Sequence, residues 1–215
     1  MSELPTIGPW WWVVGRAVNW PMAHLGMRLR RMGVEHVQGG GATLIVSNHV
    51  SQADPPLVGI AALPRQLFYM AKEELFGVPG LGHFISHLGA FPVNRGGADR
   101  EAFRTARGIL RRGDALLMFP EGTRQKDGRL AAPWPGAGSL ALEEGVRVVP
   151  AAIWGSQSLL GPPVRVAFGP QLDLSGIDGG SRSERSSRMA EAMIGAIAEL
   201  LPTVGGPVQT PPHLG

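Results

Sequence analysis

The chain divides into short apolar runs and longer stretches in which apolar residues recur at every third or fourth position. Short runs rich in β-branched residues predict buried strands, and these lie at 43–47, 67–71, 89–95, 115–119, 146–153 and 164–168. Helices are predicted at 57–63, within 79–89, and at 98–112, 139–144 and 183–201. Because strands alternate with helices and are apolar throughout, the pattern predicts an α/β fold with a mixed, mainly parallel sheet covered by helices.

These elements predict one domain over 39–201, preceded by an N-terminal amphipathic helical segment at 1–38. The proline- and glycine-rich residues 202–215 are expected to form a disordered tail. In the N-terminal segment, tryptophans at 10–12 and 20 are followed by arginines at 28, 30 and 31, and Pro21 is expected to divide the segment into two helical pieces. Tryptophans beside arginines suit the headgroup level of an anionic membrane, although the tryptophans could instead pack onto the domain's own core.

The amino-acid composition limits the kinds of structure and reaction that are open to this chain. The 215 residues include 31 glycines and 19 prolines, which indicates many loops, and the hydrophobic fraction of 44% argues against disorder. The chain has no cysteine, which excludes disulfides, thiolate metal sites and a thiol nucleophile. The net charge is only +3, and no nucleic-acid partner is expected. No signal peptide is expected, and no stretch approaches the roughly 18–20 apolar residues that span a bilayer.

The first candidate site lies between the strand at 43–47 and the helix at 57–63. His49 and Asp54 would lie about 140° apart on one continuous helix and could not meet there. Pro55 suits the first helical position and keeps the preceding residue out of the helical region, so Asp54 is expected to be the N-cap. The two side chains then flank a turn and can approach each other. A carboxylate that holds one imidazole nitrogen leaves the other free to take a proton from a hydroxyl, although a capping aspartate and a loop histidine are an alternative explanation.

A second motif, FPEGTR, occupies residues 119–124 at the end of another buried strand. The carboxyl ends of parallel strands share one edge of a sheet, so this motif can face His49. An arginine beside a glycine that exposes backbone N–H groups is suited to binding a phosphate. A further set of arginines, at positions 100, 104, 107 and 111, forms one stripe on the predicted helix 98–112. Such a stripe is either a solvated face or a contact for phosphate headgroups.

Taken together, these motifs resemble the glycerolipid acyltransferases, the family of 1-acyl-glycerol-3-phosphate acyltransferase. The family's four blocks occur in order as NHVSQAD at 48–54, GAFPVNR at 89–95, FPEGTR at 119–124 and VPAAI at 149–153. The resemblance spans about 44–170, and the order of the four blocks makes it specific. The Gly-Gly-Gly loop at 39–41 departs from the proline-containing turn that relatives usually carry.

The resemblance implies that a fatty acyl group passes from an acyl thioester to the hydroxyl of a phosphate-bearing glycerolipid, most suitably 1-acyl-glycerol-3-phosphate. His49 would be the general base and Asp54 its orienting partner. The implied substrate-binding residues are Arg95 and Arg124 on the acceptor phosphate, Lys72 as a weaker candidate, Glu121 holding the loop, and Gly122 and Thr123 for close backbone approach. No metal or prosthetic cofactor is implied, and the donor is acyl-CoA or acyl carrier protein. The protein is expected peripherally or monotopically at the cytoplasmic face of an anionic membrane.

Three alternatives remain open from the sequence. The same chemistry could serve another acceptor, such as glycerol 3-phosphate, another lysophospholipid or a glycolipid. A hydrolase could use His49 and Asp54 with His83 and His87 around a metal, since the last two lie four apart on one helix face. The chain could also be a non-catalytic lipid-binding relative, although the intact base and orienter argue against that.

Overall fold

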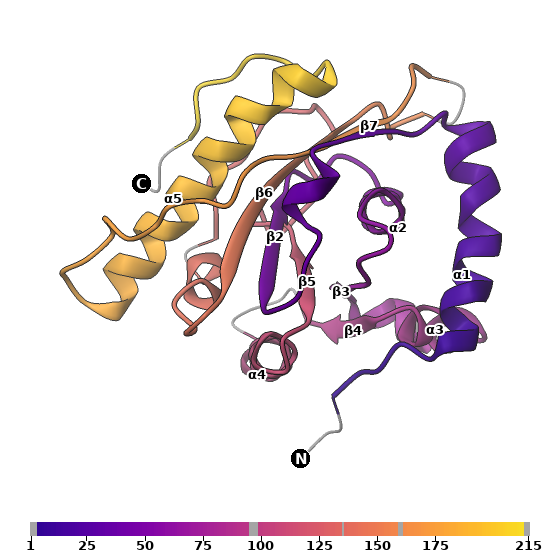
Figure 1. Ribbon diagram of the computed structural model, residues 1–215, viewed down its shortest axis with the longest axis horizontal. Helices are drawn as coiled ribbons and strands as arrows, with labels where there is room; N and C mark the ends of the chain where they lie inside the picture. The colour runs from indigo at the N-terminus through magenta and orange to yellow at the C-terminus, as the bar shows by residue number, and fades with distance from the viewer. Residues whose placement is uncertain (1–3, 95–98, 135, 159–160, 213–215) are drawn as a thin grey trace.

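The structure is a computed structural model that describes residues 4–94, 99–134, 136–158 and 161–212. Its strands form one seven-stranded sheet in the order β1-β7-β6-β2-β5-β3-β4 (Figure 1). The strands are β1 Arg30–Met32, β2 Thr43–Ser47, β3 Leu67–Lys72, β4 Ala90–Val93, β5 Ala115–Met118, β6 Arg147–Trp154 and β7 Arg165–Phe168. All pairings are parallel except that of β6 with β7. The predicted mixed, mainly parallel sheet is therefore confirmed.

Helices cover both faces of this sheet. The α-helices are α1 Pro9–Pro21, α2 Asp54–Ala61, α3 Leu81–His87, α4 Arg100–Arg111 and α5 Arg182–Leu200. Short 3-10 helices span Val34–His36, Glu73–Gly77, Ala137–Leu140 and Leu201–Val204, and a π-helical turn spans Met22–Gly26. In Figure 1, α4 and α5 lie on one side of the sheet, and α1 and α2 lie on the other.

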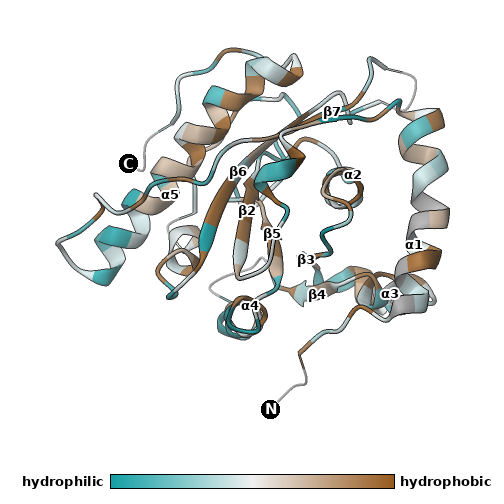
Figure 2. Ribbon diagram, viewed as in Figure 1, coloured by the Kyte–Doolittle hydropathy of each residue, from teal (hydrophilic) through white to brown (hydrophobic). Residues whose placement is uncertain are grey.

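Successive side chains of a strand point to opposite faces of the sheet, so the apolar strands contribute to two hydrophobic cores, one on each face. In β2, Leu44 and Val46 point to the core shared with α4 and α5, whereas Ile45 points to the core shared with α2. All five residues of β2 are buried, as a central parallel strand requires. Figure 2 shows hydrophobic colouring concentrated on the central strands. The core therefore fixes β2, and the loop that follows β2 carries the candidate site.

The N-terminal segment differs from the expectation that 1–38 is helical. Residues 30–32 form β1, which pairs in parallel with the edge of β7, and the N–H group of Arg30 donates to the carbonyl oxygen of Val164 at 2.8 Å. All three β1 residues are exposed, so no alternation of apolar and polar positions marks this strand in the sequence. Pro21 ends α1, where the chain turns into the π-helical turn.

Trp10, Trp11 and Trp20 of α1 do not all behave alike with respect to the two expectations, membrane contact and packing onto the domain. Trp11 packs against α3, with its ring centroid 4.7 Å from that of His87. Trp10 and Trp20 are instead 72% and 47% exposed. None of the described helices is both long enough and apolar enough to cross a bilayer.

The segment expected to be a disordered tail begins with defined contacts. Leu201 and Val204 are buried in the 3-10 helix that follows α5. Further along, the side chain of Gln209 accepts from the N–H group of Leu130 at 2.8 Å and donates to the carbonyl oxygen of Gly128 at 2.9 Å. The tail thus packs back onto the loop that follows β5, a long-range contact that composition does not reveal.

Candidate active site

Three loops meet at the carboxyl edge of the sheet because β5, β2 and β6 are adjacent and parallel. His49 lies in the loop after β2, Glu121 in the loop after β5, and Ser156 in the loop after β6. All three side chains belong to buried residues. The FPEGTR motif therefore faces His49, as the sequence predicts.

His49 and Asp54 form a buried hydrogen-bonded pair. The imidazole Nδ1 lies 2.9 Å from the Asp54 Oδ2, and the side chains are 6% and 0% exposed. A carboxylate oxygen at this distance makes Nδ1 the donor, so in the neutral imidazole it is Nε2 that carries the lone pair. The ring is held from a second direction by Phe119, which stacks on it at 4.1 Å between centroids with an interplanar angle of 19°.

Asp54 is held by more donors than His49 alone. Its Oδ2 also accepts the N–H groups of Val50 and Ser51, each at 2.7 Å, and its Oδ1 accepts the Ser156 hydroxyl at 2.5 Å. Four donors therefore converge on one fully buried carboxylate and keep its charge compensated. Ser156 was not among the site residues predicted from the sequence. The only feature that could have indicated it was its position just after a predicted buried strand.

Asp54 itself sits one position later in the helix than expected. It is the first residue of α2, and Ala53 takes the N-cap position in a helical conformation. The Asp54 carboxylate consequently points back to the loop rather than capping the helix. This arrangement arises because the N–H group of Asp54 continues the preceding turn by donating to the Ser51 carbonyl oxygen at 3.3 Å.

Asn48 anchors the loop to the neighbouring strand. Its side-chain amide donates to the carbonyl oxygen of Ile153 at 2.9 Å and accepts the N–H group of the same residue at 2.8 Å. Both groups are buried, so the pair fixes the position of the residue that precedes His49 relative to β6.

Glu121 ties the second motif to the first. Its Oε1 accepts the N–H group of His49 at 2.9 Å, and its Oε2 accepts that of Ala131 at 3.1 Å. Burial raises the pKa of Glu121 to about 7, against the opposing effect of these two backbone hydrogen bonds. The nearby charge of Asp54 raises this pKa further. Glu121 therefore connects the loop after β5 to the backbone of His49, and its ionisation is linked to folding.

The remaining candidate residues lie around this centre. Gly122, whose φ of +71° suits glycine, and Thr123 line a cavity of about 490 Å³ together with Phe119 and Glu121. The side chain of Arg124 is exposed just beyond them. Lys72, at the end of β3, forms an exposed ion pair with Glu74 at 2.7 Å. Arg95 lies outside the described residues.

The two helical histidines do not join the His49 and Asp54 pair. The rings of His83 and His87 contact each other at 4.3 Å between centroids with their planes tilted by 52°, and His87 Nδ1 donates to the His83 carbonyl oxygen at 2.8 Å. Among the residues that the structure describes, no group of three or more histidine, aspartate or glutamate side chains could hold a metal ion. The four residues of the metal-hydrolase alternative thus do not form one site.

A sequence model of the family described as Acyltransferase matches residues 28–154. The chain belongs to the acyltransferase family. The matched acyltransferase region contains His49, Asp54 and Glu121 but ends two residues before Ser156.

Acyltransferases that are named for 1-acyl-glycerol phosphate resemble the chain in sequence and in structure. This chain is 32% identical over 139 residues to a 1-acyl-sn-glycerol-3-phosphate acyltransferase of Streptococcus pneumoniae, and the match covers 62% of this chain and 51% of that protein. A Bacillus subtilis protein of the same name is 30% identical over 171 residues, covering 77% and 84% of the two chains. The crystal structure of the 1-acyl-sn-glycerophosphate (LPA) acyltransferase PlsC from Thermotoga maritima matches with a TM-score of 0.64 and 25% identity, covering 87% and 81%. The chain thus spans about half the length of the S. pneumoniae relative.

Proposed function

We propose that the protein transfers a fatty acyl group from an acyl thioester to the hydroxyl of a phosphate-bearing glycerolipid, most suitably 1-acyl-glycerol-3-phosphate, to form phosphatidic acid. The observation that carries this proposal is the buried pair of His49 and Asp54, in which the carboxylate holds Nδ1 and leaves Nε2 available as a base. The names of the similar proteins support the choice of acceptor. Glycerol 3-phosphate, other lysophospholipids and glycolipids use the same chemistry and are tested below.

In the proposed reaction, His49 Nε2 removes the proton of the acceptor hydroxyl as its oxygen attacks the thioester carbonyl carbon. The new carbon–oxygen bond forms, the carbon–sulfur bond breaks, and the imidazolium returns the proton to the departing thiolate. Asp54 stabilises the imidazolium without taking the proton, as the orienting carboxylate of a catalytic triad does, and its four hydrogen-bond donors hold it in position. A base placed in this way contributes roughly two to four orders of magnitude in rate.

The acceptor phosphate is proposed to bind Arg124, beside the cavity, and Arg95. Arg124 follows the cavity-lining residues Gly122 and Thr123 directly and is exposed, which leaves its guanidinium available. Arg95 is the second proposed contact, on sequence grounds alone. Lys72 is a weaker candidate because it is paired with Glu74. Replacing Arg124 by alanine should raise KM for the acceptor far more than KM for the donor, and equal effects on both would remove Arg124 from the phosphate site.

The first test is thiol release from an acyl-CoA, followed with a thiol reagent with and without 1-acyl-glycerol-3-phosphate. The protein has no cysteine and so adds no background. Release that requires the acceptor, is lost in His49→Ala and persists in His36→Ala would support the proposal. Release without any acceptor would indicate a thioesterase instead. Acceptor-dependent release that survives in His49→Ala would refute the assigned base, and trials with the other acceptors and with acyl carrier protein donors would complete the test.

We also propose that residues near α1 contact an anionic membrane, which would place the protein peripherally or monotopically at the cytoplasmic face. Trp10, Trp20 and Leu25 are 72%, 47% and 74% exposed, an unusual exposure for large apolar side chains. Deleting the whole segment would remove β1 from the sheet, so point substitutions are the better test. The variant carrying Trp10→Ser, Trp20→Ser and Leu25→Ser should sediment less with vesicles that contain anionic lipid, whereas the control Val208→Ser should not. Equal sedimentation of both variants and the wild type would refute this contact.

A further inference from the structure

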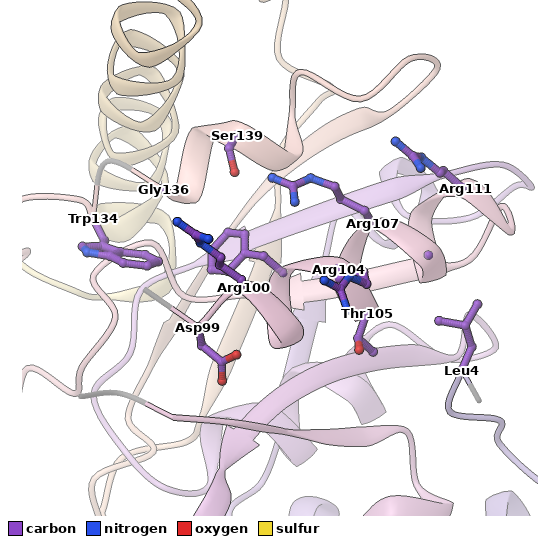
Figure 3. Close-up of a pocket in the computed structure, with 12 residues that line it drawn as sticks. Leu4, Asp99, Arg100, Arg104, Thr105, Arg107, Arg111, Trp134, Gly136 and Ser139 are labelled. Carbon is purple, nitrogen blue, oxygen red and sulfur yellow. The ribbon is translucent and has the colours of Figure 1, made fainter. Parts of the chain in front are cut away.

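A second pocket, of about 860 Å³, opens beside α4 and is strongly basic (Figure 3). Four arginines of α4 line it, at positions 100, 104, 107 and 111. Figure 3 shows Arg100 and Arg107 extending from α4 toward the side on which Trp134 and Ser139 lie, and Leu4 lies near the opposite end. Its volume is within the range of roughly 300–1,000 Å³ in which small-molecule ligands bind.

The helix presents these arginines along one side for a simple reason. They are spaced four, three and four residues apart, which places them above one another, while Ala106, Ile109 and Leu110 fill the buried side. Like charges at these spacings repel each other, so the arrangement costs stability in the absence of an opposing charge. A bound polyanion would remove this cost.

The protein supplies only part of the opposing charge. Glu143 forms an ion pair with Arg107, with 3.2 Å between its Oε1 and the arginine Nε, and its Oε2 accepts a hydrogen bond from Arg111 Nη2 at 2.7 Å. The carboxylate of Asp99, at the other end of the pocket, is already engaged by backbone N–H groups at the start of α4. In the part of the chain that the structure describes, the side chains of Arg100 and Arg104 make no hydrogen bond or ion pair, whereas those of Arg107 and Arg111 do. These two guanidinium groups are therefore available to a ligand.

The basic pocket adjoins the cavity beside the candidate active site. Asp99, Phe103 and Trp134 line both. The smaller cavity is also lined by Phe119 and Glu121, which contact the His49 ring and its backbone N–H group. A ligand with an anionic end in the basic pocket and a slender arm past Phe103 would thus reach toward His49.

We propose that the basic pocket binds the nucleotide end of coenzyme A when acyl-CoA is the donor; this inference rests on the proposed function. That end carries a 3′-phosphate and a diphosphate, and the planar guanidinium forks of Arg100 and Arg104 match phosphate oxygens. The partly exposed ring of Trp134, 5.5 Å from that of Phe103, offers an aromatic surface for adenine. The pantetheine arm would then cross between the two cavities with the thioester at its end.

The concave shape favours this occupant over the alternatives. A lipid headgroup at a membrane surface would meet arginines on a flat or convex face, whereas these line a hollow together with Trp134, Gly136 and Ser139. Acyl carrier protein would present an acidic surface in place of a nucleotide. The experiment below separates these outcomes.

The first measurement is calorimetric binding of adenosine 3′,5′-bisphosphate, the nucleotide fragment of coenzyme A. The variant carrying Arg100→Gln and Arg104→Gln should bind at least about tenfold more weakly than the wild type, because charge-assisted contacts to phosphate are lost. Arg30→Gln, which removes one exposed arginine at the opposite edge of the sheet, should bind as the wild type does. Equal affinity of all three proteins would overturn the proposal.

The second measurement compares acyl-CoA with the acyl thioester of N-acetylcysteamine, which lacks the nucleotide. In the double variant, KM should rise for acyl-CoA and stay unchanged for the truncated donor. A rise confined to acyl carrier protein donors would overturn the nucleotide site in favour of protein docking. If the wild type transfers from no thioester, the proposed function fails, and binding of the bisphosphate still decides the nucleotide site by itself.

Discussion

Replacing Glu121 by glutamine should remove a pH-dependent part of the protein's stability between about pH 4.5 and 7. Glu121 is 7% exposed and accepts the backbone N–H groups of His49 and Ala131. Burial is the main reason that its pKa in the folded protein rises from 4.5 to about 7. The unfolded chain exposes this carboxyl group to water and restores the ordinary value.

The sign of the effect follows from which state holds the proton. Between pH 4.5 and about 7 the folded protein keeps Glu121 protonated while the unfolded chain has released the proton. The free energy of unfolding therefore falls as the pH rises through this interval. The full interval corresponds to roughly 3 kcal/mol, a large share of the stability of an ordinary domain. Glutamine does not titrate, so the variant lacks this contribution.

The assay is urea unfolding of the wild type and Glu121→Gln at several pH values from 4.5 to 7.5. The wild type should lose its advantage over the variant progressively as the pH rises, apart from a constant offset from the altered hydrogen bonds. Glu199→Gln, which changes an exposed glutamate of α5, should run parallel to the wild type. A stability difference between wild type and Glu121→Gln that stays constant across this range would refute the reasoning.

Further substitutions at one serine of the site and at two glycines test how the site and the core are held. Ser156→Ala removes a hydroxyl that donates to the buried Asp54 carboxylate, so the free energy of unfolding should fall by about 1.5–3 kcal/mol, and kcat should fall with an altered pH profile. Replacing the exposed Ser158 by alanine is the control. An unchanged pH profile in Ser156→Ala would show that Ser156 has only a structural role. Gly138→Ala would force a methyl group onto the backbone of α5 and should lower the melting temperature, whereas Gly195→Ala, which faces open space within α5, should raise stability by about 0.5–1 kcal/mol. Equal melting temperatures for these two glycine variants would contradict the packing argument.

Local patterns in the sequence were enough to predict six of the seven strands, the long helices α4 and α5, and the approach of two side chains in the turn after β2. The strand predicted at 43–47 coincides with β2, and the helix predicted at 98–112 contains all of α4. Apolar periodicity is a property of neighbouring residues, and so these elements can be recognised without the fold. The approach of His49 to Asp54 was also predictable from neighbouring residues, because the two lie five positions apart and two prolines follow Asp54 directly.

The surroundings of that pair depend on long-range contacts that appear only in the folded protein. Ser156 is 102 residues from Asp54 in the chain, and Glu121 is 72 residues from His49, yet each donates or accepts a hydrogen bond there. The sheet order brings the ends of β5, β2 and β6 to one edge, and no local pattern encodes which strands become neighbours.

The same distinction applies to the edge strand and to the arginines. Residues 30–32 form β1 because their backbone pairs with the edge of β7, and their exposed side chains give no strand pattern. The stripe of arginines on α4 was visible in the sequence, but its place beside Trp134 and Ser139, and next to the cavity at the site, was not. Side-chain periodicity records which residues must be buried, whereas the partners they meet depend on backbone pairing and packing between segments far apart in the chain.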